Sequence, residues 1–125
     1  MANETSLTVI GRLTDDPQLR FTPDGQAVAN FRVASNARFF DKEERGWKDK
    51  PPIFIDCAAW GTEFAQNVHE SLHKGDRVSV TGDLEPNVYK TKDGVDVHGL
   101  KLRVTDVAAS LRFNKALVRE GERSS

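Results

Sequence analysis

The sequence predicts one small domain that is built mainly of β-strands and carries a single helix. Apolar and β-branched residues alternate with polar ones over most of the chain, and turn signals such as Asp-Pro and Asp-Gly separate these runs. Only residues 62–74 show helical periodicity. With 125 residues, of which 38% are hydrophobic, the chain is long enough for one core and too short for two ordinary domains.

The first third of the chain predicts three strands. Residues 5–14 carry partly alternating apolar residues, and Asp15-Asp16-Pro17 ends this run as a turn. A short strand is expected at residues 18–22, followed by the turn Pro23-Asp24-Gly25. Residues 27–36 alternate cleanly between apolar and polar side chains, so one face of this strand should be buried.

Residues 37–52 are polar and contain both basic and acidic side chains. We interpret them as a long hairpin loop between two strands, and a connection of this length is more often functional or disordered than inert. Trp47, near the middle of the loop, is costly to leave in water without a partner.

Residues 53–60 predict a strand with two different faces. Alternate residues form a sufficient apolar inward face: Ile55, Cys57 and Ala59. Phe54 and Trp60 then lie beside Asp56 on the outer face, where either a stacked ligand or a neighbouring subunit could cover the rings. Cys57 is the one cysteine of the chain, so an internal disulfide is impossible and a buried thiol is expected.

The second half predicts the helix and a final set of strands. An apolar stripe on residues 62–74 should plug one end of a barrel, and Gly75 follows as a typical residue just past a helix end. Strands are expected at residues 78–84, in a hairpin that turns at residues 91–94, and at the closing segment 107–111.

This order fits best an all-β fold with one helix, a five-stranded Greek-key OB barrel with its helix between strands 3 and 4, although periodicity alone also permits other small barrels. We assign residues 1–111 to this domain. Residues 112–125 form a charged C-terminal segment whose end is expected to be disordered.

Four aromatic residues are interleaved with Lys and Arg on the expected strands and hairpin loops: Phe39, Phe54, Trp60 and Tyr89. Sequence-tolerant binding of single-stranded nucleic acid needs this mixture, because every base has a flat face to stack and every nucleotide carries a phosphate. The net charge is −1, so any such site requires local segregation of charge. The sequence begins with no signal peptide and has no membrane-length apolar run, which predicts a cytoplasmic protein.

Over about residues 5–111 the chain resembles the bacterial single-stranded DNA-binding protein family. The matching stretches are residues 9–13 with Asp16-Pro17, residues 25–33, 65–75 and 78–84, and the Asp93-Gly94 turn. No one motif is diagnostic, but their order and spacing make the resemblance specific.

The resemblance implies how single-stranded DNA would be bound. The family's base-stacking aromatics fall on Phe39, Phe54, Trp60 and Tyr89, to which we add Trp47 as a candidate. Phosphate contacts would come from nearby cations: Arg12, Arg32, Arg38, Lys74 and Lys90. The resemblance also implies a homotetramer built as a dimer of dimers, and residues 112–118 could form an extra strand that clasps a neighbouring subunit, as in actinobacterial members.

The chain departs from the family pattern in three places. Asp56 stands where members commonly carry a basic residue, and Glu85-Pro86-Asn87-Val88 precedes Tyr89 where several basic residues are usual. Fewer neutralised phosphates predict weaker and less salt-dependent binding. The family's C-terminal tip is acidic and hydrophobic and recruits replication and repair enzymes. The given sequence ends with Arg123-Ser124-Ser125 and shows no such tip, so the resemblance makes no prediction for these partners.

Two other functions are compatible with parts of the sequence. His69-Glu70-Ser71-Leu72-His73 matches the H-E-x-x-H motif of zinc hydrolases, with His98 as the one remaining histidine. We interpret this match as coincidental, because Lys74-Gly75 ends the helix at once and the family pattern needs neither histidine. The second alternative is an OB-fold interaction module whose aromatics contact proteins. We expect no enzyme activity and no cofactor.

Overall fold

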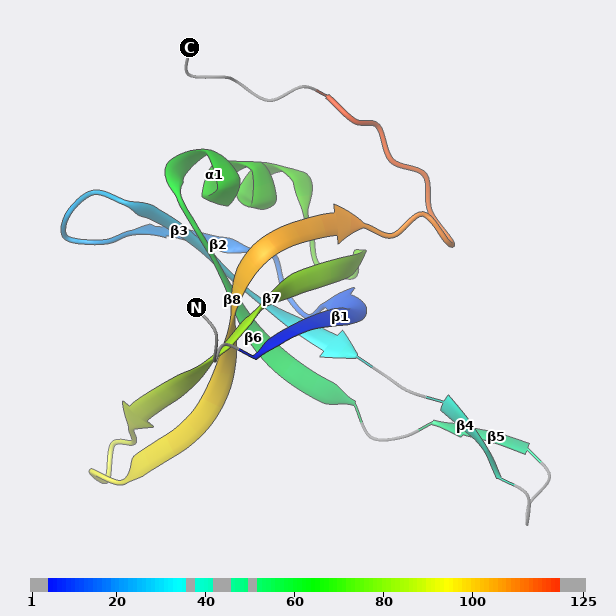
Figure 1. Ribbon diagram of the computed structural model, residues 1–125, viewed down its shortest axis with the longest axis horizontal. Coiled ribbons are helices and arrows are strands. Elements are labelled where there is room, and N and C mark those ends of the chain that lie inside the picture. Colours follow the sequence, from blue (N-terminus) through cyan, green and yellow to red (C-terminus); the bar gives the residue numbers. More distant parts are fainter. Residues whose placement is uncertain (1–4, 36–37, 42–45, 50–51, 120–125) are drawn as a thin grey trace.

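Five long strands in the described part of the chain close into a barrel, and the helix lies across one end of it (Figure 1). The computed structural model describes residues 5–35, 38–41, 46–49 and 52–119. The elements of the barrel are β1 (Ser6–Leu13), β3 (Ala27–Ser35), β6 (Ile53–Trp60), α1 (Thr62–Ser71), β7 (Arg77–Lys90) and β8 (Asp96–Ala109).

The strand order identifies the topology. The hydrogen-bonded order is β1-β7-β8-β6-β3, and β1 also pairs with β3, which closes the ring. β6 and β8 are parallel, whereas the other neighbouring pairs are antiparallel. A short strand, β2 (Gln18–Phe21), lies beside β3. The predicted five-stranded Greek-key OB barrel, with the helix between its third and fourth strands, is confirmed.

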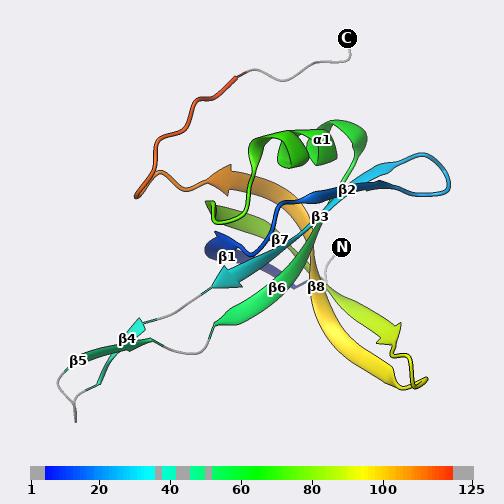
Figure 2. The ribbon, with the colours of Figure 1, turned by 180° about the vertical axis from the view of Figure 1, so that it is seen from behind.

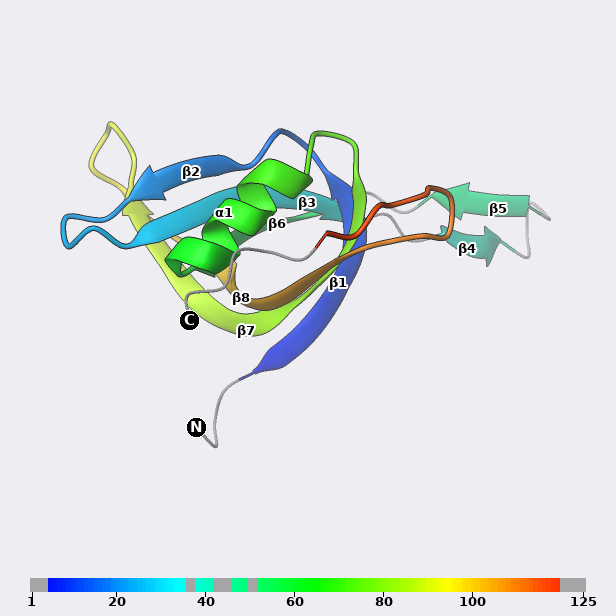
Figure 3. The same cartoon turned by 90° about the horizontal axis from the view of Figure 1, so that it is seen from above.

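Residues 37–52 are more regular than the sequence indicated. Within them, β4 (Arg38–Asp41) and β5 (Gly46–Asp49) pair as an antiparallel hairpin. This hairpin projects away from the barrel (Figures 2 and 3). Aromatic residues favour extended backbone, which is consistent with pairing here.

The helix ends earlier than predicted. It stops at Ser71, and Leu72 adopts an extended conformation with only 7% of its side chain exposed. Burial of Leu72 in the core therefore takes the chain out of the helix before His73. Gly75, with φ +90°, serves the turn that follows and not the helix end. No helix among the described residues has the length and apolar content needed to cross a membrane.

The two C-terminal strands are long and continuous, so residues 107–109 of the predicted separate segment 107–111 belong to β8, which ends at Ala109. The register between β7 and β8 shifts at Thr81 and Gly82. A Cβ atom on Gly82 would overlap the backbone of Arg103 across the sheet. Glycine is therefore required for the close approach of the two strands at this irregularity.

The core lies between the inner faces of the strands and the buried side of α1. From the helix, Ala65 and Val68 enter it, and the expected plug at one end of the barrel is confirmed. Leu102 is fully buried, and Cys57 is 3% exposed. Burial, with a smaller contribution from the charge of Asp56, raises the pKa of the Cys57 thiol to about 12. The predicted buried thiol is confirmed.

Candidate nucleic-acid interface

The strand registers place a set of side chains opposite the core, on what we call the outer face. On β6 the inner face is Ile55, Cys57 and Ala59, and the residues between them point outward. Arg32 of β3 lies across from Asp56, which lies across from Lys101 of β8, which lies across from Glu85 of β7. These four residues form one row across four strands.

A second row lies beside the first. Trp60 lies across from Val28 of β3, which lies across from Arg20 of β2. Val28 is fully buried although it is not part of the core cluster. Trp60 itself is half-buried.

The two rows border a hollow in the outer face of about 470 Å³. Its lining includes aromatic, cationic, acidic and amide side chains: Arg20, Asn30, Arg32, Asp56, Trp60 and Asn87. Lys101 lies in the same wall. A concave surface with one ring, several cations and several amides can stack a base and contact phosphates.

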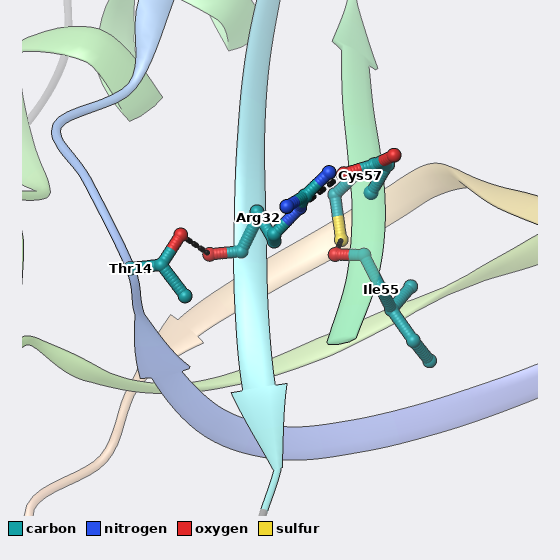
Figure 4. Close-up of polar contacts among 5 residues, drawn as sticks. Thr14, Arg32, Ile55 and Cys57 are labelled. Carbon is teal, nitrogen blue, oxygen red and sulfur yellow. Dashed lines mark hydrogen bonds and ion pairs between the residues drawn. The ribbon is translucent and has the colours of Figure 1, made fainter. Parts of the chain in front are cut away.

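Arg32 and Asp56 form the closest ion pair of the outer face. Arg32 Nε donates to Asp56 Oδ1 at 2.7 Å, and the two side chains are 54% and 47% exposed. The hydrogen bond and the charge of Asp56 raise the pKa of Arg32, with a smaller contribution from Tyr89. Thr14 anchors the backbone, because its N–H donates to the Arg32 carbonyl at 3.0 Å and its hydroxyl approaches the same oxygen (Figure 4). Arg32, predicted as a phosphate contact, therefore already has a carboxylate partner.

Trp60 also has a charged neighbour that the sequence did not indicate. The guanidinium carbon of Arg103 lies 5.6 Å from the centre of the Trp60 ring, a cation–π distance. Glu85 Oε1 lies 3.7 Å from the same guanidinium group. Arg103 is thus placed to contact a base or phosphate that approaches Trp60.

The structure brings two further predicted rings to the outer face. Phe54 is 56% exposed and lies two residues from Asp56 along β6, on the same face. Tyr89 is 53% exposed on β7, two residues from Asn87, which lines the hollow. With Trp60, these residues provide three rings on one surface of the barrel.

The remaining predicted cations are dispersed. Arg12 Nη1 donates to the Gly75 carbonyl at 2.9 Å. Lys74 is exposed next to Gly75, and its backbone N–H donates to Asp16 Oδ1 at 2.8 Å, at the edge of the hollow. Lys90 is exposed at the end of β7.

Three predicted site residues lie on the β4-β5 hairpin. Arg38 and Phe39 belong to β4, and Trp47 belongs to β5. In the hairpin Phe39 pairs with Lys48, and Phe40 pairs with Trp47. Their side chains lie outside the part of the structure that is described.

Sequence reasoning missed Arg20, Lys101 and Arg103. Lys101 and Arg103 alternate with the buried Leu102 and Val104, which does indicate that they point outward. No local pattern in the sequence indicates the parallel pairing of β6 with β8 that sets them beside Asp56 and Trp60.

The zinc-site alternative fails on geometry. The H-E-x-x-H motif needs both histidines on one face of a continuous helix. His69 lies on α1, but the helix ends at Ser71, and His73 lies beyond it with Nδ1 3.9 Å from Asp76 Oδ2. In the described ranges, no three His, Cys, Asp or Glu side chains come together in a way that could hold a metal ion.

A closed barrel of this strand order, capped by one helix and carrying exposed rings and cations on one face, defines an OB-fold domain with an open binding surface. The family model described as the single-strand binding protein family matches residues 4–110. The chain therefore belongs to the single-strand binding protein family.

Similar proteins agree with this assignment. A single-stranded DNA-binding protein of Paenarthrobacter aurescens is 47% identical over 125 residues, which is 100% of this chain and 72% of the relative. One from Mycolicibacterium smegmatis is 46% identical over 124 residues, covering 99% of this chain and 74% of the relative.

Solved structures share the fold. The crystal structure of a small single-stranded DNA-binding protein from Streptomyces coelicolor has a TM-score of 0.74 at 27% identity, over 87% of this chain and 96% of that chain. A Plasmodium falciparum complex with single-stranded DNA has a TM-score of 0.73, over 84% of this chain and 93% of that chain. At 21% identity it supports the fold alone.

Proposed function

We propose that the protein binds single-stranded DNA with little sequence preference, without catalysis, and protects it during replication, recombination and repair. One observation carries the proposal. Phe54 and Tyr89 are large rings, 56% and 53% exposed, on the same face as Trp60. A stacked base would cover such rings and contribute about 1–3 kcal/mol per base. The relatives that bear the name single-stranded DNA-binding protein support the same function.

We assign roles by position on the outer face. Phe54, Trp60 and Tyr89 stack bases, and Phe39 and Trp47 of the β4-β5 hairpin extend this surface. Phosphates contact the predicted cations, Arg12, Arg32, Arg38, Lys74 and Lys90, together with Arg20, Lys101 and Arg103 around the hollow.

Length-dependent binding tests the proposal. A gel-shift with dT oligomers of increasing length should give complexes whose affinity rises until the site is filled, and a duplex of the same length should bind far more weakly. Binding should weaken as salt is raised, since phosphate contacts release counterions. Equal affinity for duplex and single strand would contradict the proposal.

The interaction-module alternative makes a different prediction for the same surface. If the rings contact another protein, oligo-dT will leave the tryptophan fluorescence unchanged. If they stack bases, oligo-dT will quench the fluorescence of Trp60. It will also quench that of Trp47, because we assign the β4-β5 hairpin to the same binding surface.

We further propose a cytoplasmic, nucleoid-associated homotetramer built as a dimer of dimers. Residues 112–118 support a clasping role, because within this chain the described residues there form no strand and their apolar side chains are exposed: Phe113 at 66%, Leu117 and Val118 at 89%. Light scattering should give the mass of four chains. Deletion of the residues after Leu111 should lower the melting temperature of the assembly, and an unchanged melting curve would remove the clasp.

A further inference from the structure

We propose that Asp56 acts as a resident anion on the binding face: its carboxylate occupies Arg32 in place of a DNA phosphate, and so limits both the affinity for single strands and the salt dependence of binding. This inference rests on the proposed function. It assigns to Asp56 a role in setting the strength of binding and not in holding the fold.

The geometry of the pair supports competition. Arg32 Nε donates to Asp56 Oδ1 at 2.7 Å, a charge-assisted hydrogen bond of ordinary strength. About half of each side chain is open to solvent. A phosphate oxygen, which is also an anionic acceptor, can therefore reach the same guanidinium group from outside and replace the carboxylate.

Other charged residues around the Arg32–Asp56 pair are also arranged with opposite charges side by side. Along the first row the charges alternate, with Arg32 and Lys101 positive and Asp56 and Glu85 negative. The row has a net charge of zero although it borders the hollow. The second cation beside the rings, Arg103, likewise has a carboxylate of Glu85 at 3.7 Å. Arg32 and Arg103 thus each have a carboxylate of the protein itself as a neighbour.

The consequence for binding follows from charge. When a strand docks, Arg32 exchanges Asp56 for a phosphate, and the released carboxylate stays within the hollow beside that phosphate. The gain from the new ion pair is offset by the loss of the old one and by repulsion between two anions. Because an exposed ion pair contributes little to stability, the exchange does not disturb the fold.

Charge-neutral variants test this inference. Asp56→Asn keeps the size of the side chain and removes its charge. We expect it to bind a dT oligomer about fivefold more tightly at moderate salt. The slope of log K against log salt should steepen by about 0.7, the value for one additional phosphate contact on a single strand. The matched control is Glu70→Gln, an exposed residue of α1, which removes the same charge at a distance from the hollow.

Arg32→Gln separates the proposed mechanism from a general effect of charge. In the Asp56→Asn background it should remove the gain. Melting temperatures of all variants check that the fold is retained.

The outcomes are distinct. If Asp56→Asn binds no more tightly than the wild type, or if Glu70→Gln gives the same gain, the inference is wrong while the proposed function stands. If the gain persists when Arg32 is also replaced, Asp56 acts on something other than this arginine and the inference is again wrong. If the wild type itself does not bind dT oligomers, the proposed function fails.

Discussion

The two faces of β6 differ in what they contribute. Cys57 and Ala59 point inward and are almost completely buried, whereas Phe54 and Asp56 alternate with them and remain largely open to solvent. The inner face is apolar and contributes to stability through burial. The exposed residues of the outer face, such as Phe54 and Asp56, contribute little to the fold. Substitutions on the inner face should therefore change stability, and substitutions on the outer face should change binding.

The strongest test of this separation is a large cavity in the core. Leu102→Ala should lower the free energy of unfolding by about 2–5 kcal/mol, because the side chain is fully buried between β6 and β7. Urea denaturation measures the loss. Leu100→Ala, on the same strand and 64% exposed, should change it by less than about 0.5 kcal/mol. Similar losses at both positions would break the comparison.

Removing a ring from the outer face should weaken DNA binding and leave stability unchanged. Phe54→Ala or Tyr89→Ala should weaken binding of a dT oligomer by about 1–3 kcal/mol and leave the unfolding curve unchanged. The matched control is Phe21→Ala, since Phe21 is 61% exposed but pairs with the buried Ala27 and so lies on the opposite face of the sheet. An equal loss of binding in this control would mean that the rings of the outer face have no special role.

The close approach of Gly82 to the backbone of Arg103 gives a further test of which residues determine stability. Gly82→Ala should destabilise the protein by about 1–3 kcal/mol, since a Cβ atom there overlaps the backbone of Arg103. At Gly99 the added Cβ would be 3.6 Å from the Asn87 carbonyl oxygen, an ordinary contact, so Gly99→Ala should cost much less. Thermal unfolding of the two variants compares them, and equal costs would contradict the close approach at Gly82.

The smallest expected effect concerns the thiol of Cys57. Its pKa is raised from 9.0 to about 12, so the folded protein holds this proton more tightly than the unfolded chain. The stability that this provides is complete below pH 9 and is lost as the pH rises toward 12. The loss should be less than about 1 kcal/mol at pH 9.5 and should be absent in Cys57→Ala. A pH dependence that survives this substitution would assign it to another group.

The sequence predicted the fold well because its signals are local. Alternation and turn residues identified the strands, and the apolar stripe identified α1. The end of the helix was wrong because Leu72 leaves the helix to enter the core, a tertiary effect that local propensity does not contain. The β4-β5 hairpin was predicted only as a loop.

The site was predicted in part, for a related reason. The prediction that Phe54 and Trp60 lie on the outer face is confirmed. Side chains alternate between the two faces of a strand, so both residues lie on the face opposite to the buried Cys57. The row that links Arg32 to Asp56 and Lys101 depends on strands far apart in the sequence, one pair of which is parallel. Such registers are set by the closure of the barrel, and the local pattern of residues along one strand does not reveal them.

The most direct test of base stacking on the outer face uses the fluorescence of one residue. The chain has two tryptophans, so Trp47→Phe leaves Trp60 as the only reporter, on the outer face beside Arg103. Titration of this variant with oligo-dT should quench its emission to a saturating value, and a duplex of equal length should have little effect. Emission that does not change while the strand demonstrably binds would contradict stacking on this ring.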